Sequence, residues 1–152
     1  MPEYGAPPQV TPKRLGDYLE VMSKAVFQSG MSWAVVNKKW PTIREAFRDF
    51  DADAVAALGE REIDALAQDT RVIRNRRKIE AIIENANRMI AIEKEHGSFK
   101  KYLRSHGGFY ETVADLRKQF KFVGETGCYI FLYIVKEEVP PHEEWEANRK
   151  KK

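Results

Sequence analysis

Residues 120–124, with the sequence FKFVG, have the residue types and spacing of a site that binds an anion. They form a short apolar turn between helical patterns at residues 110–119 and 126–135. Gly124 can adopt a positive φ and lets another backbone approach closely, so the amides ahead of the second helix can point outward together. The start of a helix binds anions. The turn therefore predicts a phosphate site, and the alternative is an ordinary corner between two helices.

Basic side chains surround this turn. Lys121, Lys118 and Arg117 add positive charge beside the amides, whereas Glu125 is an unfavourable neighbour for an anion. A DNA phosphate is the expected ligand, and contacts of this kind position a protein on DNA without reading its sequence. The predicted phosphate-binding residues are Lys121, Phe122, Val123, Gly124 and Arg77.

Arg77 belongs to a second feature, the basic cluster at residues 71–78, in which five of eight side chains are basic and none is acidic. The cluster leads into the longest helical pattern of the chain. Clustered positive charge is the electrostatic footprint of nucleic-acid binding. The alternative is a solvated helix face with no ligand.

A third feature is the turn at residues 28–33, with the sequence QSGMSW. Met31 follows Gly30 and is the kind of apolar side chain that fills a gap in a base stack. Trp33 has an aromatic face on which an extruded base can stack. Gly30 and Met31 are therefore predicted to form a DNA wedge, and Trp33 the wall of a base pocket. For Met31 and Trp33 the alternative is a place in the ordinary hydrophobic core.

The composition indicates a single globular domain. The chain has 152 residues, of which 43% are hydrophobic, and its net charge is +3. A single cysteine, Cys128, excludes an internal disulfide framework, and no group of cysteine and histidine has zinc-ligand spacing. The longest apolar run, residues 128–135, is too short to span a bilayer. We therefore expect a cytoplasmic protein with no membrane segment, no metal and no cofactor.

The expected fold is all-α, a compact multi-helix domain that contains a helix-hairpin-helix motif. Thr11 as N-cap and Pro12 at the first helical position predict the start of the first helix, and Gly30 its end. Pro41 is expected to break the second helix and to start a third. The expected helices cover residues 11–29, 33–39, 42–47, 51–58, 60–69, 75–96, 98–103, 110–119 and 126–135.

The two ends of the chain differ from this helical part. Residues 1–10 contain three prolines and a glycine and are predicted to form a flexible arm. Residues 11–145 are predicted to form the domain. Pro140 and Pro141 are expected to exclude further helix, so that residues 146–152 form a solvated basic tail.

Residues 28–33, 73–79 and 120–126 resemble the three signature segments of the type I 3-methyladenine DNA glycosylase family, in the family's order and at similar spacing. This family belongs to the helix-hairpin-helix glycosylases, which flip an alkylated base out of DNA and hydrolyse its N-glycosidic bond. The resemblance implies a DNA glycosylase of base excision repair that acts on double-stranded DNA containing a damaged base. We further expect a monomer associated with the bacterial nucleoid.

The sequence also departs from the family pattern. The family's pocket glutamate lies three residues before the glutamine of the first segment, and this position is Ala25, which accepts no hydrogen bond. The family's zinc-binding cysteine and histidine and its pocket tyrosine have no counterpart in residues 1–10. Tyr4 or Tyr18 is left to replace that tyrosine. His142 lies near a family zinc-ligand position, but no cysteine follows it.

The predicted base pocket consists of Trp33, Gln28 and Tyr18, and no residue is assigned as catalytic. Because of Ala25, a DNA-damage-binding protein that has lost catalysis is the main alternative. A helical protein-interaction module that uses the same apolar surfaces is the second.

Overall fold

The structure is a computed structural model that describes residues 7–150, and this part of the chain is helical with no strand, which confirms the predicted all-α class. No helix in it is both long enough and apolar enough to cross a membrane. The elements are α1 (Leu15–Gln28), α2 (Trp33–Ala46), η2 (Arg48–Phe50), α3 (Ala52–Ala56), α4 (Glu60–Leu66), α5 (Arg76–His96), α6 (Phe99–Leu103), α7 (Phe109–Gln119), α8 (Glu125–Ile134) and α9 (His142–Lys150).

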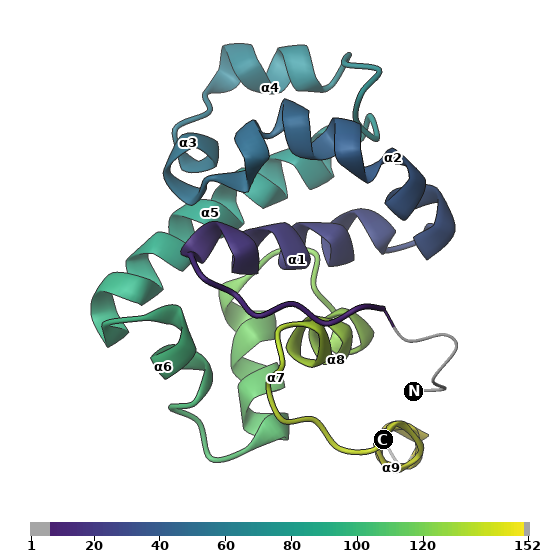
Figure 1. Ribbon diagram of the computed structural model, residues 1–152, viewed down its shortest axis with the longest axis vertical. Helices are drawn as coiled ribbons and strands as arrows, with labels where there is room; N and C mark the ends of the chain where they lie inside the picture. The colour runs from purple at the N-terminus through teal and green to yellow at the C-terminus, as the bar shows by residue number, and fades with distance from the viewer. Residues whose placement is uncertain (1–6, 151–152) are drawn as a thin grey trace.

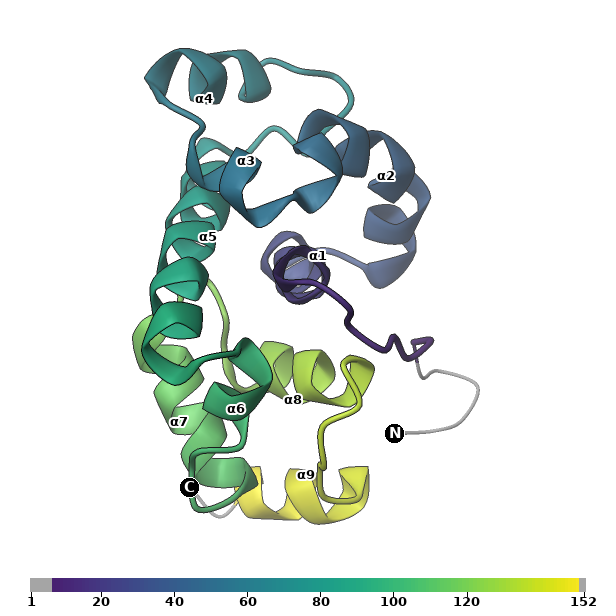
Figure 2. The same cartoon turned by 60° about the vertical axis from the view of Figure 1, so that its left-hand side comes forward.

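Helix α1 lies at the centre of this arrangement. It packs against α2, α5 and α8, and its Leu19, Val26 and Phe27 are completely buried. In Figure 1, α2, α3 and α4 lie on one side of α1, and α7, α8 and α9 lie on the other. Figure 2 shows that the long helix α5 runs along both groups. The core therefore extends across two layers of helices that share α1 and α5.

Helix α1 begins later than predicted, with Arg14 as N-cap in place of Thr11. The carboxylate of Asp17 accepts hydrogen bonds from the backbone N–H groups of Lys13 and Arg14, at 2.8 and 3.3 Å. An acidic residue in the first turn also suits the positive end of the helix dipole. The Thr11 hydroxyl accepts a hydrogen bond from Lys136 Nζ at 2.7 Å, so Thr11 contacts the segment that follows α8 and does not cap α1.

The predicted break at Pro41 is wrong, because α2 continues through this residue to Ala46. Pro41 itself is exposed, whereas Val36 and Trp40 before it and Ile43 after it are buried on one face. A proline inside a helix removes one backbone hydrogen bond and bends the helix. Packing of both halves of α2 against the same core outweighs that loss.

The prediction that Pro140 and Pro141 exclude further helix is also wrong, because α9 begins at His142. The carbonyl of Pro141 accepts a hydrogen bond from the backbone N–H of Trp145 at 3.0 Å, and proline is well tolerated at a helix start. The buried Trp145 ring packs on Tyr129 of α8, with 4.5 Å between ring centroids. The predicted boundary at residue 145 therefore falls inside a helix.

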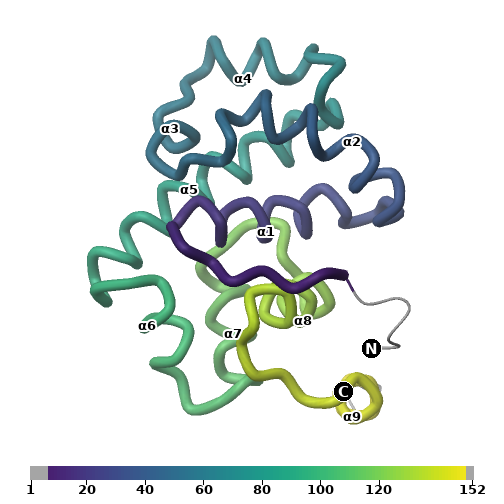
Figure 3. The backbone as a smooth tube through the Cα atoms, viewed as in Figure 1, coloured from purple at the N-terminus to yellow at the C-terminus, as the bar shows by residue number. Residues whose placement is uncertain are grey.

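The described part of the predicted arm is attached to the helical domain. The backbone N–H of Val10 donates to the carbonyl of Ile134 at 2.7 Å, and Gln9 Nε2 donates to the carbonyl of Tyr133 at 2.8 Å. The tube in Figure 3 follows this segment past α1 to the end of α8. Tyr4 lies outside the described residues.

The short element η2 is a left-handed turn, with φ angles of 58°, 55° and 54° at Arg48, Asp49 and Phe50. This conformation is unfavourable for residues other than glycine. Phe50 is completely buried and stacks on Trp40 and Phe47, with centroid distances of 5.3 and 5.4 Å. Aromatic packing in the core therefore offsets the cost of the turn.

Candidate nucleic-acid interface

The hairpin, residues 120–124, joins α7 to α8. Phe120 and Val123 are buried and anchor it at both ends. Its left-handed residue is Phe122, with φ of 59°, and the expectation of a positive φ at Gly124 is wrong. Gly124 has φ of −95° because it is the extended N-cap of α8, and the chain reverses before it. Apart from its chain neighbours, no atom of the described residues would lie within 4 Å of a Cβ added to Gly124, so this side of the hairpin is open.

The start of α8 presents backbone donors on this open side. The first N–H groups of a helix have no partner within it, and the earliest helical bond at this end runs from Cys128 to the carbonyl of Gly124. Lys118 and Lys121 are exposed nearby. Among the described residues, no carboxylate lies within 4 Å of either ammonium group. The amides and lysines together give the hairpin the positive potential expected of a phosphate site.

The side chain of Asn85 in α5 holds the backbone of the hairpin in place. Its Oδ1 accepts a hydrogen bond from the backbone N–H of Lys121 at 2.8 Å, and its Nδ2 donates to the Lys121 carbonyl at 3.1 Å. Asn85 was not among the predicted site residues. The available signal was a polar side chain on the apolar stripe of the longest helix, three residues after Ile82 and four before Met89.

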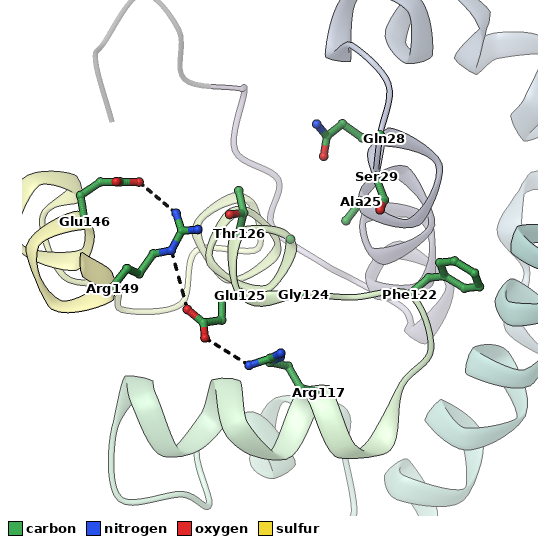
Figure 4. Close-up of a pocket in the computed structure, with 12 residues that line it drawn as sticks. Ala25, Gln28, Ser29, Arg117, Phe122, Gly124, Glu125, Thr126, Glu146 and Arg149 are labelled. Carbon is green, nitrogen blue, oxygen red and sulfur yellow. Dashed lines mark hydrogen bonds and ion pairs between the residues drawn. The ribbon is translucent and has the colours of Figure 1, made fainter. Parts of the chain in front are cut away.

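A cleft of about 820 Å³ lies beside the hairpin, between the C-terminal end of α1, the start of α8 and α9. Figure 4 shows these three elements facing a common space. Its lining residues are Ala25, Gln28, Ser29, Gly30, Arg117, Phe122, Gly124, Glu125, Thr126, Gly127, Glu146 and Arg149. The hairpin and the first signature segment are thus brought together.

Ion pairs run along one wall of the cleft. Glu125 pairs with Arg117 at 3.2 Å and with Arg149 of α9 at 3.7 Å, and Arg149 also pairs with Glu146 at 3.1 Å (Figure 4). The negative charge of Glu125, which is unfavourable for binding an anion nearby, is therefore balanced by two arginines. Arg149 was missed because its segment was predicted to be a solvated tail.

Two of the five basic residues in the cluster at residues 71–78, Arg71 and Arg76, are paired with acids. Arg71 binds Asp69 and Glu45, at 2.8 and 3.2 Å. Arg76 binds Asp64, Glu60 and Glu80, at 2.6, 3.1 and 3.3 Å. These two arginines therefore hold the surface helices together and contribute little free positive charge.

Lys78, the last residue of the cluster, is only 6% exposed. Its Nζ donates to the carbonyl oxygens of Phe27 and Ser29, at 3.1 and 2.5 Å, and so caps the C-terminal end of α1. Burial lowers the pKa of Lys78 below its ordinary value. The second signature segment thereby fixes the position of the first.

Arg77 points to the hairpin. It is exposed, and its guanidinium carbon lies 5.9 Å from the centroid of the Phe122 ring. No carboxylate of the described residues lies within 4 Å of this guanidinium. The two basic residues predicted to bind phosphate, Lys121 in the hairpin and Arg77 beside Phe122, therefore lie on the same side of the molecule.

Comparison with known proteins identifies the family. Residues 8–119 match the model of the methyladenine glycosylase family. The chain belongs to this family. It is 36% identical to the DNA-3-methyladenine glycosylase of Haemophilus influenzae over 126 residues, which covers 69% of this chain and 68% of that protein. It is 34% identical to DNA-3-methyladenine glycosylase 1 of Escherichia coli, with coverage of 69% and 67%.

Solved structures of the methyladenine glycosylase family have the same fold. A crystal structure of 3-methyladenine DNA glycosylase I superposes with a TM-score of 0.73 at 31% identity, covering 83% of this chain and 81% of that one. The Staphylococcus aureus 3-methyladenine DNA glycosylase I superposes with a TM-score of 0.74 at 25% identity, covering 83% and 78%. The family model ends at residue 119, just before the hairpin.

Ala25, the residue predicted to replace the family's pocket glutamate, lines the cleft and is 3% exposed. A Cβ built on Gly127 of α8 would come within 3.7 Å of the Ala25 methyl group. Helices α1 and α8 therefore approach closely here through two small residues. The carboxylates that line the cleft are Glu125 and Glu146, and both are paired with Arg149.

The residues predicted to bind the base are not all brought together. Gln28 lines the cleft, and its Nε2 donates to the carbonyl of Met31 at 3.2 Å. Gly30 is exposed with φ of 80°, and the half-buried Met31 packs against the core. Tyr18 is buried, with its ring 5.0 Å from that of Phe99, and does not line the cleft.

Trp33 lies in a second cavity, the arm hollow, whose volume is about 240 Å³. This hollow is closed on one side by the described part of the arm and on another by the end of α8. Its lining residues are Pro7, Pro8, Val10, Asp17, Glu20, Val21, Lys24, Trp33, Asn37 and Ile134. Trp33 and Gln28 therefore face different spaces, although they are five residues apart.

His142, which lies near a family zinc-ligand position, and the single cysteine, Cys128, both have other contacts in the structure. Within residues 7–150 no group of three His, Cys, Asp or Glu side chains has a geometry that could hold a metal ion. The ring of His142 packs against Trp145, with centroids 5.6 Å apart. Cys128 is buried in α8, and this burial raises the pKa of its thiol to about 12.

Proposed function

We propose that this chain is a DNA glycosylase that excises an alkylated purine such as 3-methyladenine from double-stranded DNA. Membership of the methyladenine glycosylase family carries the proposal, and the hairpin beside a cleft supports it. We further propose that the protein acts as a monomer on the DNA of the bacterial nucleoid, in the cytoplasm.

The hairpin would hold the DNA backbone. A phosphate can accept hydrogen bonds from the free amides at the start of α8, and Lys121 and Arg77 lie on the same side of the molecule. These contacts carry no sequence information. They suit an enzyme that must find a damaged base in any sequence.

The chemistry demands little of the protein. An adenine alkylated at N3 is cationic, so when the bond between C1′ and N9 breaks, both electrons leave with the base and the base becomes neutral. A water oxygen then bonds to C1′ and releases a proton to solvent. The protein must extrude the nucleotide, hold the base and admit water. This agrees with a site in which no side chain is placed as a catalytic base.

Two spaces along α1 can receive the base. The cleft adjoins the hairpin and contains Gln28, whereas the arm hollow contains Trp33 as its aromatic surface. We keep Trp33 as the proposed stacking wall and Met31 as the proposed wedge. Substitutions of residues that line the cleft and of residues that line the arm hollow would show which space receives the base.

Two observations favour a second function, a DNA-damage-binding protein without catalysis. Ala25 places a methyl group in the cleft lining, and both carboxylates lining the cleft are engaged in ion pairs. Such a site can bind an extruded nucleotide and still lack the hydrogen bond that family members make to the base.

The deciding experiment is release of free 3-methyladenine from methylated duplex DNA by the purified protein, followed by chromatography of the released bases. Time-dependent release above the spontaneous rate supports the glycosylase. Tight binding to damaged duplex without release supports the second function. If the protein neither releases the base nor binds damaged duplex tightly, both proposed functions are refuted.

A further inference from the structure

Phe122 combines two unfavourable properties. It is 42% exposed, and its φ of 59° lies in the left-handed region, which is rare for a bulky residue. Phe50 has a similar φ of 54°, but it is completely buried between aromatic rings. No comparable packing offsets the backbone of Phe122. Strain that the fold itself does not require is often found at sites of function.

The hairpin holds this ring in a fixed place. Asn85 binds both backbone groups of Lys121, the preceding residue, and Val123, the following residue, is buried. The left-handed turn therefore projects the Phe122 side chain outward while its neighbours stay anchored. The guanidinium of Arg77 lies beside the ring, at 5.9 Å.

Phe122 lies at the border of two concave surfaces. One is the cleft, and the other is the hairpin hollow of about 620 Å³. The hairpin hollow is lined by Ser29, Ala114, Arg117, Lys118, Phe120, Lys121, Phe122, Val123 and Gly124. Phe122 lines both spaces, so it forms part of the ridge between the lysine-bearing surface and the cleft.

We propose that the ring of Phe122 packs against the deoxyribose of the extruded nucleotide, with the phosphate of that nucleotide in the hairpin hollow. This inference rests on the proposed action on damaged DNA. A sugar has an apolar C–H face, and rotation of a nucleotide out of the duplex brings that face to the protein. The ring thus contributes to binding only after extrusion, and Phe122 is a residue that selects and positions the lesion.

The test compares Phe122→Gly and Phe122→Leu with the wild type. A second exposed aromatic residue, Tyr110, is 40% exposed at the far end of α7, and Tyr110→Ala is the matched control. Each protein is titrated with a duplex containing one stable abasic-site analogue and with an intact duplex of the same sequence. Thermal unfolding of each variant is measured in parallel.

We expect Phe122→Gly to weaken binding to the abasic duplex by about tenfold, the loss of one ring contact, and to weaken binding to the intact duplex by a smaller factor. Phe122→Leu should show a smaller loss, and Tyr110→Ala none. The melting temperature of Phe122→Gly should stay within about 3 °C of the wild type, because glycine prefers the left-handed backbone.

Equal affinity of wild type and Phe122→Gly for the abasic duplex would overturn the inference and leave the proposed function intact. A large fall in melting temperature with unaltered discrimination in the folded protein would assign the ring a structural role instead, which also overturns it. Failure of the wild type to bind either duplex would overturn the proposed function, and this inference with it.

Discussion

The cleft and the arm hollow lie along the same helix, α1, but offer a nucleotide different surroundings. The cleft is the larger, about 820 against 240 Å³, and arginines and glutamates form one of its walls. The arm hollow has one aromatic side chain, Trp33, among its lining residues. Groups that attract a phosphate and a group that stacks a base are therefore separated. A short continuous segment, residues 28–33, contributes to both spaces.

The sharpest way to distinguish the two spaces is a pair of substitutions. Trp33→Ala should lower the single-turnover rate of base excision by about tenfold to a hundredfold, because an aromatic face returns about 1 to 3 kcal/mol of the lost stacking. Binding to undamaged duplex should be nearly unchanged. Gln28→Ala is the matched variant in the cleft and should have the smaller effect.

A larger loss in Gln28→Ala than in Trp33→Ala would place the base in the cleft. A sharp fall in the melting temperature of Trp33→Ala, with a normal rate in the folded fraction, would make Trp33 a core residue. Val35→Ala, at an exposed position of the same helix, controls for general effects on α2.

The second prediction concerns the phosphate side of the comparison. Lys121→Ala and Arg77→Ala should each weaken binding to duplex DNA and reduce the salt slope of log K by up to about one unit, the change expected for one lost phosphate contact. Arg76→Ala is the control, since Arg76 is held in three ion pairs. A salt slope that is the same in wild type and both variants would exclude the hairpin as the docking surface.

The third prediction compares the local stability of the backbone at the cleft with that at the arm hollow. Lys78→Met removes the ammonium that caps α1 and leaves the Phe27 carbonyl without that partner, at a cost of about 1 to 3 kcal/mol. The melting temperature should fall by roughly 2 to 4 °C per kcal/mol. The rim of the cleft at Ser29 should loosen, measured by faster amide hydrogen exchange at residues 27–31. Exchange around Trp33 in the arm hollow should change less, and uniform acceleration in both would contradict a local role for Lys78.

The smallest expected effect is that of metal removal. Dialysis against a chelator should leave excision and the melting temperature unchanged, because the described residues contain no group suited to a metal ion and the Cys128 thiol stays protonated. Elemental analysis before dialysis is the direct measurement. One zinc per chain that survives dialysis would show that this expectation is wrong.

Local signals predicted most helix boundaries. Asn75 and Ser98 are N-caps whose side chains accept hydrogen bonds from backbone N–H groups three residues on, and Gly97 ends α5 with a positive φ. The errors at Pro41 and Pro141 have one cause. A proline sets a local preference, but burial of Trp40 and Trp145 against distant helices decides the outcome.

The candidate site was less predictable than the fold. The amino-acid pattern indicated the hairpin and the basic cluster, but it contained no information on which arginines would meet acids from other segments. Asp64 and Glu60 reach Arg76 from another helix, and Glu125 meets Arg149 from the C-terminal one. Such pairings depend on tertiary distances, so the sequence alone could not distinguish the exposed Arg77 from the paired Arg76.

The pairing of Glu125 with Arg117 and Arg149 also affects how DNA binding depends on salt. A phosphate that contacts an unpaired lysine releases a condensed cation from the DNA, and this release produces the salt dependence. A phosphate that contacts Arg117 must instead displace the Glu125 carboxylate, an anion bound to the protein itself. That exchange liberates fewer mobile ions overall. Contacts to Arg117 at the cleft should therefore keep their contribution to the affinity at salt concentrations that weaken contacts to Lys118 and Lys121.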